Sequence, residues 1–65
     1  MKNLTDKEME VLRLLSEGYS IKEISELLCY SYSSIANRRL SIYDKLGAVT
    51  DASAVAMAFR EGILE

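Results

Sequence analysis

Residues 20–46 of this chain read SIKEISELLCYSYSSIANRRLSIYDKL, two short helical patterns joined by about three residues. Each pattern opens on a serine that can cap a helix, Ser20 in the first and Ser31 in the second. The second pattern also carries the adjacent pair Arg38 and Arg39. Two short helices on so brief a turn predict a helix-turn-helix at about 20–46, whose second helix has the size and shape to lie in the major groove of DNA.

Four helices are predicted for the whole chain, at about residues 6–17, 21–28, 32–46 and 51–61. The first two follow the capping-box pattern of a hydroxyl residue with a glutamate three positions later, in Thr5 with Glu8 and in Ser20 with Glu23. Apolar spacing places the core on Val11, Leu12, Leu15, Ile24, Leu27, Leu28, Ile35, Ile42 and Leu46. The predicted fold class is therefore all-α, a single four-helix domain over residues 1–65.

The charge of the chain is unevenly distributed. Its 8 basic and 10 acidic residues give a net charge of −2, which is low for DNA-binding domains because these normally neutralise phosphates with cations. Residues 27–50, however, hold Arg38, Arg39 and Lys45 against Asp44 alone, and they form the only positive segment. This distribution favours a DNA contact through the second helix of the helix-turn-helix, while the low total predicts weak affinity from a single copy.

Composition also disfavours several other classes of protein. The chain has no His and only one Cys, Cys29, so neither a metal site nor a disulfide is expected, and no cofactor is predicted. Cys29 is expected to be a small apolar filler of the turn. The sequence contains no glycine-rich phosphate loop and no paired carboxylates that would suggest catalytic residues, so an enzyme is not expected. No apolar run approaches the roughly 20 residues that span a bilayer, and we expect a cytoplasmic protein with no membrane partner.

The fourth helical pattern is apolar nearly all round. One side of this helix is expected to close the core, and the other side has nothing in the chain to cover it. We therefore expect a dimer contact through the helix at about 51–61. The candidate interface residues are Ala52, Val55, Ala56, Met57 and Phe59.

With these residues in view, the chain resembles the LuxR-type, or GerE-type, helix-turn-helix domain of bacterial transcription regulators. The resemblance runs from Leu4 to Leu64 and covers essentially the whole chain. It rests on Leu4-Thr5, Glu8, Glu10-Val11-Leu12-Arg13-Leu14-Leu15, Glu17-Gly18, Ser20, Lys22-Glu23-Ile24, Glu26, Leu28, Ser31, Ser34-Ile35, Ile42, Lys45-Leu46-Gly47 and Ala54-Val55. It implies a domain that binds double-stranded DNA, with the third helix in the major groove and the fourth helix pairing two subunits.

The resemblance also implies that bases are read at the positions of Ala36, Asn37 and Leu40. Members of the family commonly read Thr-Val-Lys-x-His over residues 34–38, so the usual Lys is Ala36 here and the usual His is Arg38. Asn37 suits either a bidentate contact with adenine or solvent. Ala36 and Leu40 donate no hydrogen bonds, so on DNA they would meet thymine methyl groups. Leu40 would otherwise belong to a protein interface.

Contacts with the DNA backbone are expected at the beginning of the second and third helices. Tyr32, Ser33 and Ser34 open the third helix, where free backbone N–H groups and hydroxyls can hold a phosphate. Ordinary helix capping is the alternative role for these residues. Lys22, in the first turn of the second helix, is placed for a phosphate at the edge of the groove, although a solvated lysine fits equally well.

The two adjacent arginines are expected to differ in burial. Arg38 lies near the edge of the core face, so its stem can follow apolar neighbours while its guanidinium reaches a phosphate. Arg39 is expected to be the freer one, suited to a phosphate or to a guanine edge.

The resulting prediction is a transcription regulator that binds double-stranded DNA as a homodimer, on half-sites about one helical turn apart. RNA polymerase, and a receiver or ligand-binding domain outside this chain, are further candidate partners. The main alternative is a protein-interaction module, an adaptor or antagonist of a related regulator, that keeps the fold without reading DNA. The related helix-turn-helix of sigma-factor region 4 is a second alternative. The sequence fits a stand-alone regulator and a piece of a larger one equally well.

Overall fold

Four helices make up the fold: α1 (Asp6–Ser16), α2 (Ile21–Leu28), α3 (Tyr32–Leu46) and α4 (Asp51–Arg60). The computed structural model describes residues 3–65, so the first two residues of the predicted domain lie outside the described range. No strand occurs within that range, and the predicted all-α fold class is confirmed. Each helix begins and ends within one residue of its predicted bounds. None of the described helices is long and apolar enough to cross a membrane.

Local hydrogen bonds explain where the first two helices begin. The hydroxyl of Thr5 accepts from the N–H of Glu8, and the Glu8 carboxylate accepts in return from the N–H of Thr5. Ser20 and Glu23 repeat this arrangement at the start of α2. Because each box satisfies two backbone donors that the helix itself leaves unpaired, both predicted capping boxes fix the start of their helices, as the sequence pattern indicated.

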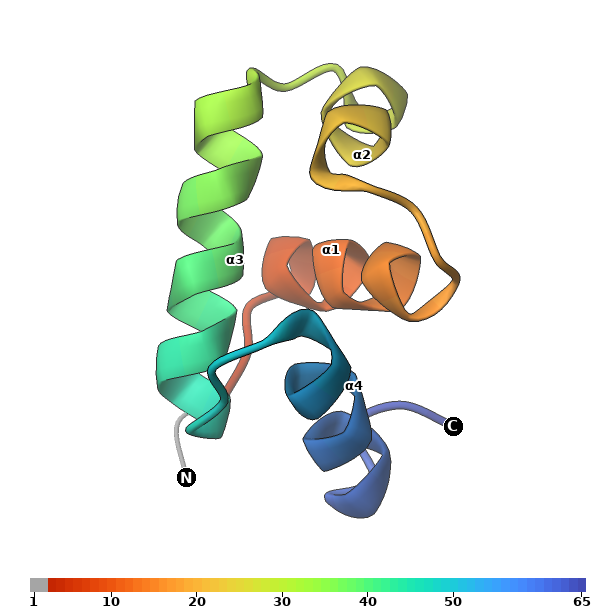
Figure 1. Ribbon diagram of the computed structural model, residues 1–65, viewed down its shortest axis with the longest axis vertical. Helices are drawn as coiled ribbons and strands as arrows, with labels where there is room; N and C mark the ends of the chain where they lie inside the picture. The colour runs from red at the N-terminus through yellow and green to blue at the C-terminus, as the bar shows by residue number, and fades with distance from the viewer. Residues whose placement is uncertain (1–2) are drawn as a thin grey trace.

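The longest helix, α3, stands along one side of the molecule, and the other three helices all pack against its inner side (Figure 1). The core where they meet consists of Val11, Leu12, Ile21, Ile24, Ile35, Ile42, Leu46, Ala54, Ala58 and Leu64. Ile35 and Ile42 are fully buried, and they lie two turns apart on one face of α3. Because α3 gives only this face to the core, its opposite face remains at the surface.

Two predictions about the region around the turn are wrong. Leu27 was expected in the core, but it is 56% exposed on α2. The buried stripe of this short helix follows Ile21, Ile24 and Ser25, and Leu27 lies to one side of it. Cys29 does not fill the turn; it is exposed, and its φ of 60° is the left-handed conformation that ends α2. The chain can therefore reverse direction between α2 and α3 without a glycine.

A buried carboxylate joins α1 to α3, a role beyond the capping that the sequence indicated. Glu8 is 5% exposed, and it accepts hydrogen bonds from Lys45 Nζ at 2.6 Å and from Ser41 Oγ at 2.5 Å. Burial by itself raises the pKa of Glu8, but the hydrogen bonds from Lys45, Ser41 and the Thr5 backbone outweigh it and lower the pKa to about 2. Glu8 is therefore charged at neutral pH and neutralises Lys45.

Candidate nucleic-acid interface

The outer face of α3 carries a row of small or uncharged side chains. Ser33, Asn37 and Leu40 are exposed, and their spacing of four and three residues aligns them along the helix axis. Leu40 is 59% exposed. Ala36 is half-buried against the core, so it lies at the edge of this row. Of the three predicted base-reading residues, two therefore lie fully at the surface, and the small side chains allow another surface to approach the helix backbone closely.

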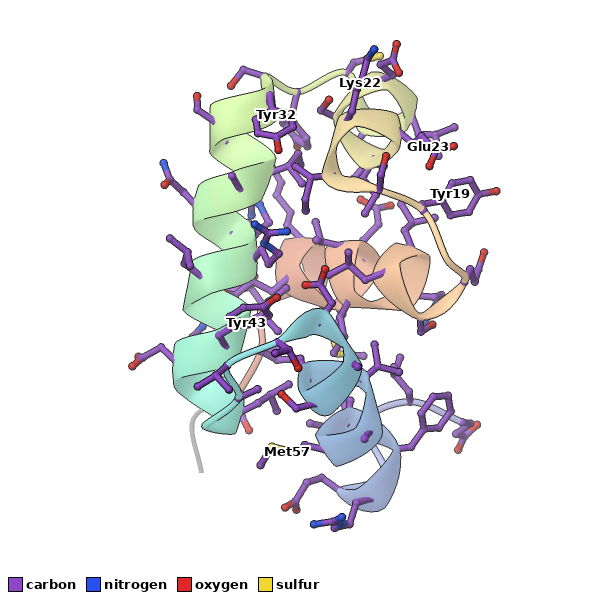
Figure 2. The ribbon with its side chains drawn as sticks, in the orientation of Figure 1. Tyr19, Lys22, Glu23, Tyr32, Tyr43 and Met57 are labelled. Atoms are coloured by element: carbon purple, nitrogen blue, oxygen red, sulfur yellow. The ribbon has the colours of Figure 1, made fainter. Side chains whose placement is uncertain are left out.

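The amino end of α3 carries backbone donors that remain free. Ser31 Oγ accepts from the N–H of Ser34 at 3.2 Å and donates to the Ser34 hydroxyl at 2.9 Å, so Ser34 takes part in capping. Tyr32 and Ser33 are exposed, and their backbone N–H groups have no acceptor within the described chain. Lys22 lies at the same end of the molecule (Figure 2). Free amides at the positive end of a helix dipole and a nearby ammonium are well suited to an anion.

Arg39 is half-buried like Arg38 and is paired with a carboxylate, so the expectation that it is the freer arginine is wrong. Its Nη1 lies 3.7 Å from Asp51 Oδ2, and its guanidinium lies over the Tyr43 ring, 6.0 Å from the centroid. The Tyr43 hydroxyl donates to the other oxygen of Asp51. Burial, together with this hydrogen bond, raises the pKa of Tyr43 to about 12. Asp51 thus ties two side chains of α3 to the first residue of α4.

Arg38 has no carboxylate partner among the described residues, in contrast to Arg39. It is half-buried, as predicted for the edge of the core face, and its guanidinium lies 5.7 Å from the centroid of the Tyr30 ring. Its Nε, like that of Arg39, is shielded from solvent and has no acceptor in the described chain. A polar hollow beside it is lined by Glu8, Ser34, Asn37, Arg38 and Ser41. The fold therefore brings Arg38 together with Ser34 and Asn37, three of the predicted contact residues.

Lys7 also reaches this region, although the sequence gave no reason to select it. Its Nζ lies 5.2 Å from the centroid of the same Tyr30 ring, and the residue is exposed on the first turn of α1. Tyr30 itself is half-buried in the turn between α2 and α3. With Arg38, the contacts of Tyr30 join three separate segments of the chain, so neither helical spacing nor local composition could have indicated them.

The candidate dimer residues of α4 do not all share one side of the helix. Ala52, Ala56 and Phe59 are exposed, and their spacing of four and three places them on one side with the half-buried Val55. Met57 is also half-buried, but helical geometry turns it well away from that row, and it lies in the half of the molecule opposite Lys22 (Figure 2). The row of four residues is a continuous surface, and Met57 is not part of it.

These features define a class of protein. A helix that follows α2 after a tight turn, keeps its outer face at the surface and begins with free amides is the recognition helix of a helix-turn-helix DNA-binding domain. The chain belongs to the luxR family of bacterial regulatory proteins, since the GerE domain of that family matches residues 2–58. The family resemblance drawn from the sequence is thereby confirmed, and with it the assignment to DNA-binding transcription regulation.

The relatives with the matching sequence are regulators. The chain is 41% identical over 61 residues to the transcriptional regulatory protein YdfI of Bacillus subtilis, a match that covers 94% of the chain and 29% of the relative. It is 39% identical over 57 residues to the methanol utilization control regulatory protein MoxX of Paracoccus denitrificans, covering 88% and 26%. The oxygen regulatory protein NreC of Staphylococcus aureus is 34% identical over 64 residues, covering 98% and 30%.

A solved structure shares the fold over nearly the whole chain. The response regulator ChrA, from a heme-sensing two-component system, superposes with a TM-score of 0.94 at 25% sequence identity, covering 98% of this chain and 32% of ChrA. The chain thus spans less than a third of the length of ChrA and of the curated relatives that it matches.

Proposed function

We propose that this domain regulates transcription by placing α3 in the major groove of double-stranded DNA. The observation that carries the proposal is the exposed row on α3, which begins at free backbone amides and continues through Asn37 and Leu40. Asn37 would pair with adenine through two hydrogen bonds, and Leu40 would contact a thymine methyl group. Ala36, at the edge of the row, adds no hydrogen bond and lets the backbone approach the bases.

The DNA backbone would be held at the amino end of α3. The N–H groups of Tyr32 and Ser33 and the ammonium of Lys22 would contact phosphates there, because all three are exposed at one end of the molecule. Arg38 would add a further phosphate contact, since it has no carboxylate partner within the described chain. Arg39 is already paired with Asp51, so it would instead fix the position of α3 against α4.

We further propose that the domain acts as a homodimer through α4, with Ala52, Val55, Ala56 and Phe59 in the contact. Phe59 is 50% exposed, and it extends the apolar row formed by Ala52, Val55 and Ala56. Two copies related by a twofold axis would read half-sites about one helical turn apart. Each subunit of this dimer would contribute the single domain of residues 1–65. The domain would act in the bacterial cytoplasm, beside a receiver or ligand-binding domain, and would contact RNA polymerase. It would catalyse no reaction.

Selection of bound duplexes from a random pool, followed by sequencing, tests this function. The expected result is enrichment of a site with twofold symmetry, together with stronger binding at low salt. If no sequence is enriched and random duplex does not bind even in dilute buffer, the groove-binding role is wrong. The protein-interaction alternative, which the net charge of −2 and the exposed Leu40 favour, would then hold.

A matched pair of variants tests the role of Asn37. Asn37→Ala should relax the preference for adenine at one position of the enriched site and weaken binding by about 1–3 kcal/mol. Asn3→Ala removes the same side chain from an exposed position before α1 and should leave both quantities unchanged. Equal behaviour of the two variants would contradict base reading by Asn37.

A further inference from the structure

We propose that Lys7, Tyr30 and Arg38 form a phosphate site that lets α1 hold the DNA backbone beside the groove occupied by α3. This inference rests on the proposed function and adds a contact from a helix outside the helix-turn-helix. The three residues come from the first turn of α1, from the turn before α3 and from the middle of α3. We refer to them below as the Tyr30 site.

The geometry places two cations around one aromatic ring. Lys7 Nζ lies 5.2 Å and the Arg38 guanidinium 5.7 Å from the centroid of Tyr30. The two positive groups therefore lie no farther apart than the sum of these distances. Both distances are within the range of cation–π attraction, so the Tyr30 ring holds both side chains close to it.

The charges at this site are not balanced by the protein. Neither Lys7 nor Arg38 forms an ion pair with a carboxylate in residues 3–65, whereas Lys45 and Arg39 both do. The Nε atoms of Arg38 and of Arg39 both lack an acceptor in that range although they are shielded from solvent, so the missing ion pair is what distinguishes Arg38. Two like charges held near each other repel, and a ring offsets this repulsion only in part. A phosphate oxygen within reach of both cations would offset this repulsion, so the arrangement fits an anionic ligand.

The neighbouring hollow suits a phosphodiester. It is lined by Glu8, Ser34, Asn37, Arg38 and Ser41, so hydroxyl and amide donors adjoin the guanidinium. Glu8 does not make the hollow repel anions, because its two oxygens accept from Lys45, Ser41 and the Thr5 backbone and its charge is compensated. Arg38 also adjoins Asn37 in the chain, so a phosphate at the Tyr30 site would belong to the strand next to the bases that Asn37 reads. A guanidinium and an ammonium together suit the diester of a nucleic-acid backbone.

The test compares Lys7→Gln with Arg13→Gln in a salt titration of DNA binding by the intact chain. Both residues are exposed cations on α1, but Arg13 lies at the other end of the helix, beside a hollow formed with Phe59 and the C-terminal residues. Both variants change the net charge equally. Fluorescence anisotropy with a duplex of the enriched sequence gives the slope of log K against log salt, and circular dichroism confirms that both variants are folded.

Lys7→Gln is expected to reduce the salt slope by up to about 0.9 per bound subunit, the value for one phosphate, because Arg38 still contacts the shared phosphate. Between about 50 and 200 mM salt, the affinity of this variant should therefore fall by a factor up to about threefold smaller per subunit than that of the unmodified protein. Arg13→Gln should keep the original slope. Equal slopes for the two variants would overturn the Tyr30 site while leaving groove binding by α3 intact. Failure of the unmodified protein to bind any duplex would instead overturn the proposed function.

A double variant tests whether the two cations share one phosphate. If they do, the losses of binding free energy from Lys7→Gln and Arg38→Gln should not add in the double variant, because the first change already weakens the contact that the second removes. Additive losses would show that the two cations act on separate phosphates, and the shared site would be wrong. A random duplex should give the same result as the enriched one, since a backbone contact carries no sequence information.

Discussion

Replacing Glu8 by glutamine should destabilise the domain at neutral pH by roughly 3 kcal/mol. Folding lowers the pKa of Glu8 from its ordinary 4.5 to about 2, and each unit corresponds to about 1.4 kcal/mol. Removing one partner of a buried ion pair costs about 3–5 kcal/mol in other proteins, which agrees with this figure. A domain of this size is typically stable by only about 3–10 kcal/mol, so Glu8→Gln should bring it close to unfolding.

The pH dependence of stability follows from the direction of the same shift. Because the pKa is lower in the folded state, the stabilisation by Glu8 is complete above pH 4.5 and is lost as the pH falls toward 2. The unmodified protein should therefore unfold at progressively lower urea concentration across that window. Glu8→Gln, which keeps a side chain able to complete the capping box, should lack this part of the acid sensitivity.

Urea unfolding followed by circular dichroism measures both effects. Glu10→Gln is the matched control, because Glu10 is an exposed carboxylate on the same helix. It should change the free energy of unfolding by less than about 0.5 kcal/mol. The reasoning would be refuted if Glu8→Gln behaved like Glu10→Gln at neutral pH. It would equally be refuted if the stability of the unmodified protein did not change between pH 4.5 and 2.

Three further changes probe the turn, the α3–α4 contact and the dimer. Asp51→Asn should release Arg39 and steepen the salt slope of DNA binding by about 0.9 per subunit; an unchanged slope in anisotropy titrations would show that the guanidinium stays away from DNA. Ala56→Asp should lower the dimer fraction in sedimentation velocity, and an unaltered profile would remove α4 from the interface. Cys29→Gly should raise the free energy of urea unfolding by about 0.5–1 kcal/mol, because only glycine adopts φ near 60° without a steric cost; a loss of stability would contradict this.

The helices and their caps could be predicted from the sequence because the interactions that set them are local. Thr5 bonds to Glu8 and Ser20 to Glu23, each three residues away, so the pattern is visible in a short window. The apolar spacing of α3 fixed Ile35 as a core residue in the same way. Leu27 was misplaced because a helix of two turns offers several alternative stripes, and only packing against α3 selects one.

The electrostatics of the candidate site could not be predicted in this way. Whether Arg39 is available depends on Asp51, a residue of another helix, and Glu8 finds Lys45 and Ser41 far along the chain. Long side chains choose partners only after the helices have packed, and their sequence neighbours do not reveal the choice. The sequence therefore indicated which helix carries the cations, but it did not indicate which of them are free.

The net charge of −2 does not oppose DNA binding once the charges are placed in the fold. Ion pairs with Glu8 and Asp51 compensate Lys45 and Arg39, and of the other described cations Lys7, Lys22 and Arg38 are the ones proposed to contact phosphates. Glu23 and Tyr19 lie on the side of the molecule away from α3 (Figure 2), so the carboxylate of Glu23 lies away from the proposed DNA-binding helix. Because Lys7 and Arg38 would share one phosphate, these three cations support only about two phosphate contacts per subunit and about four in a dimer, for which binding falls roughly a hundredfold between about 50 and 200 mM salt. We therefore expect specific binding to depend on the proposed dimerisation, and a variant that is monomeric should bind DNA weakly even with α3 unchanged.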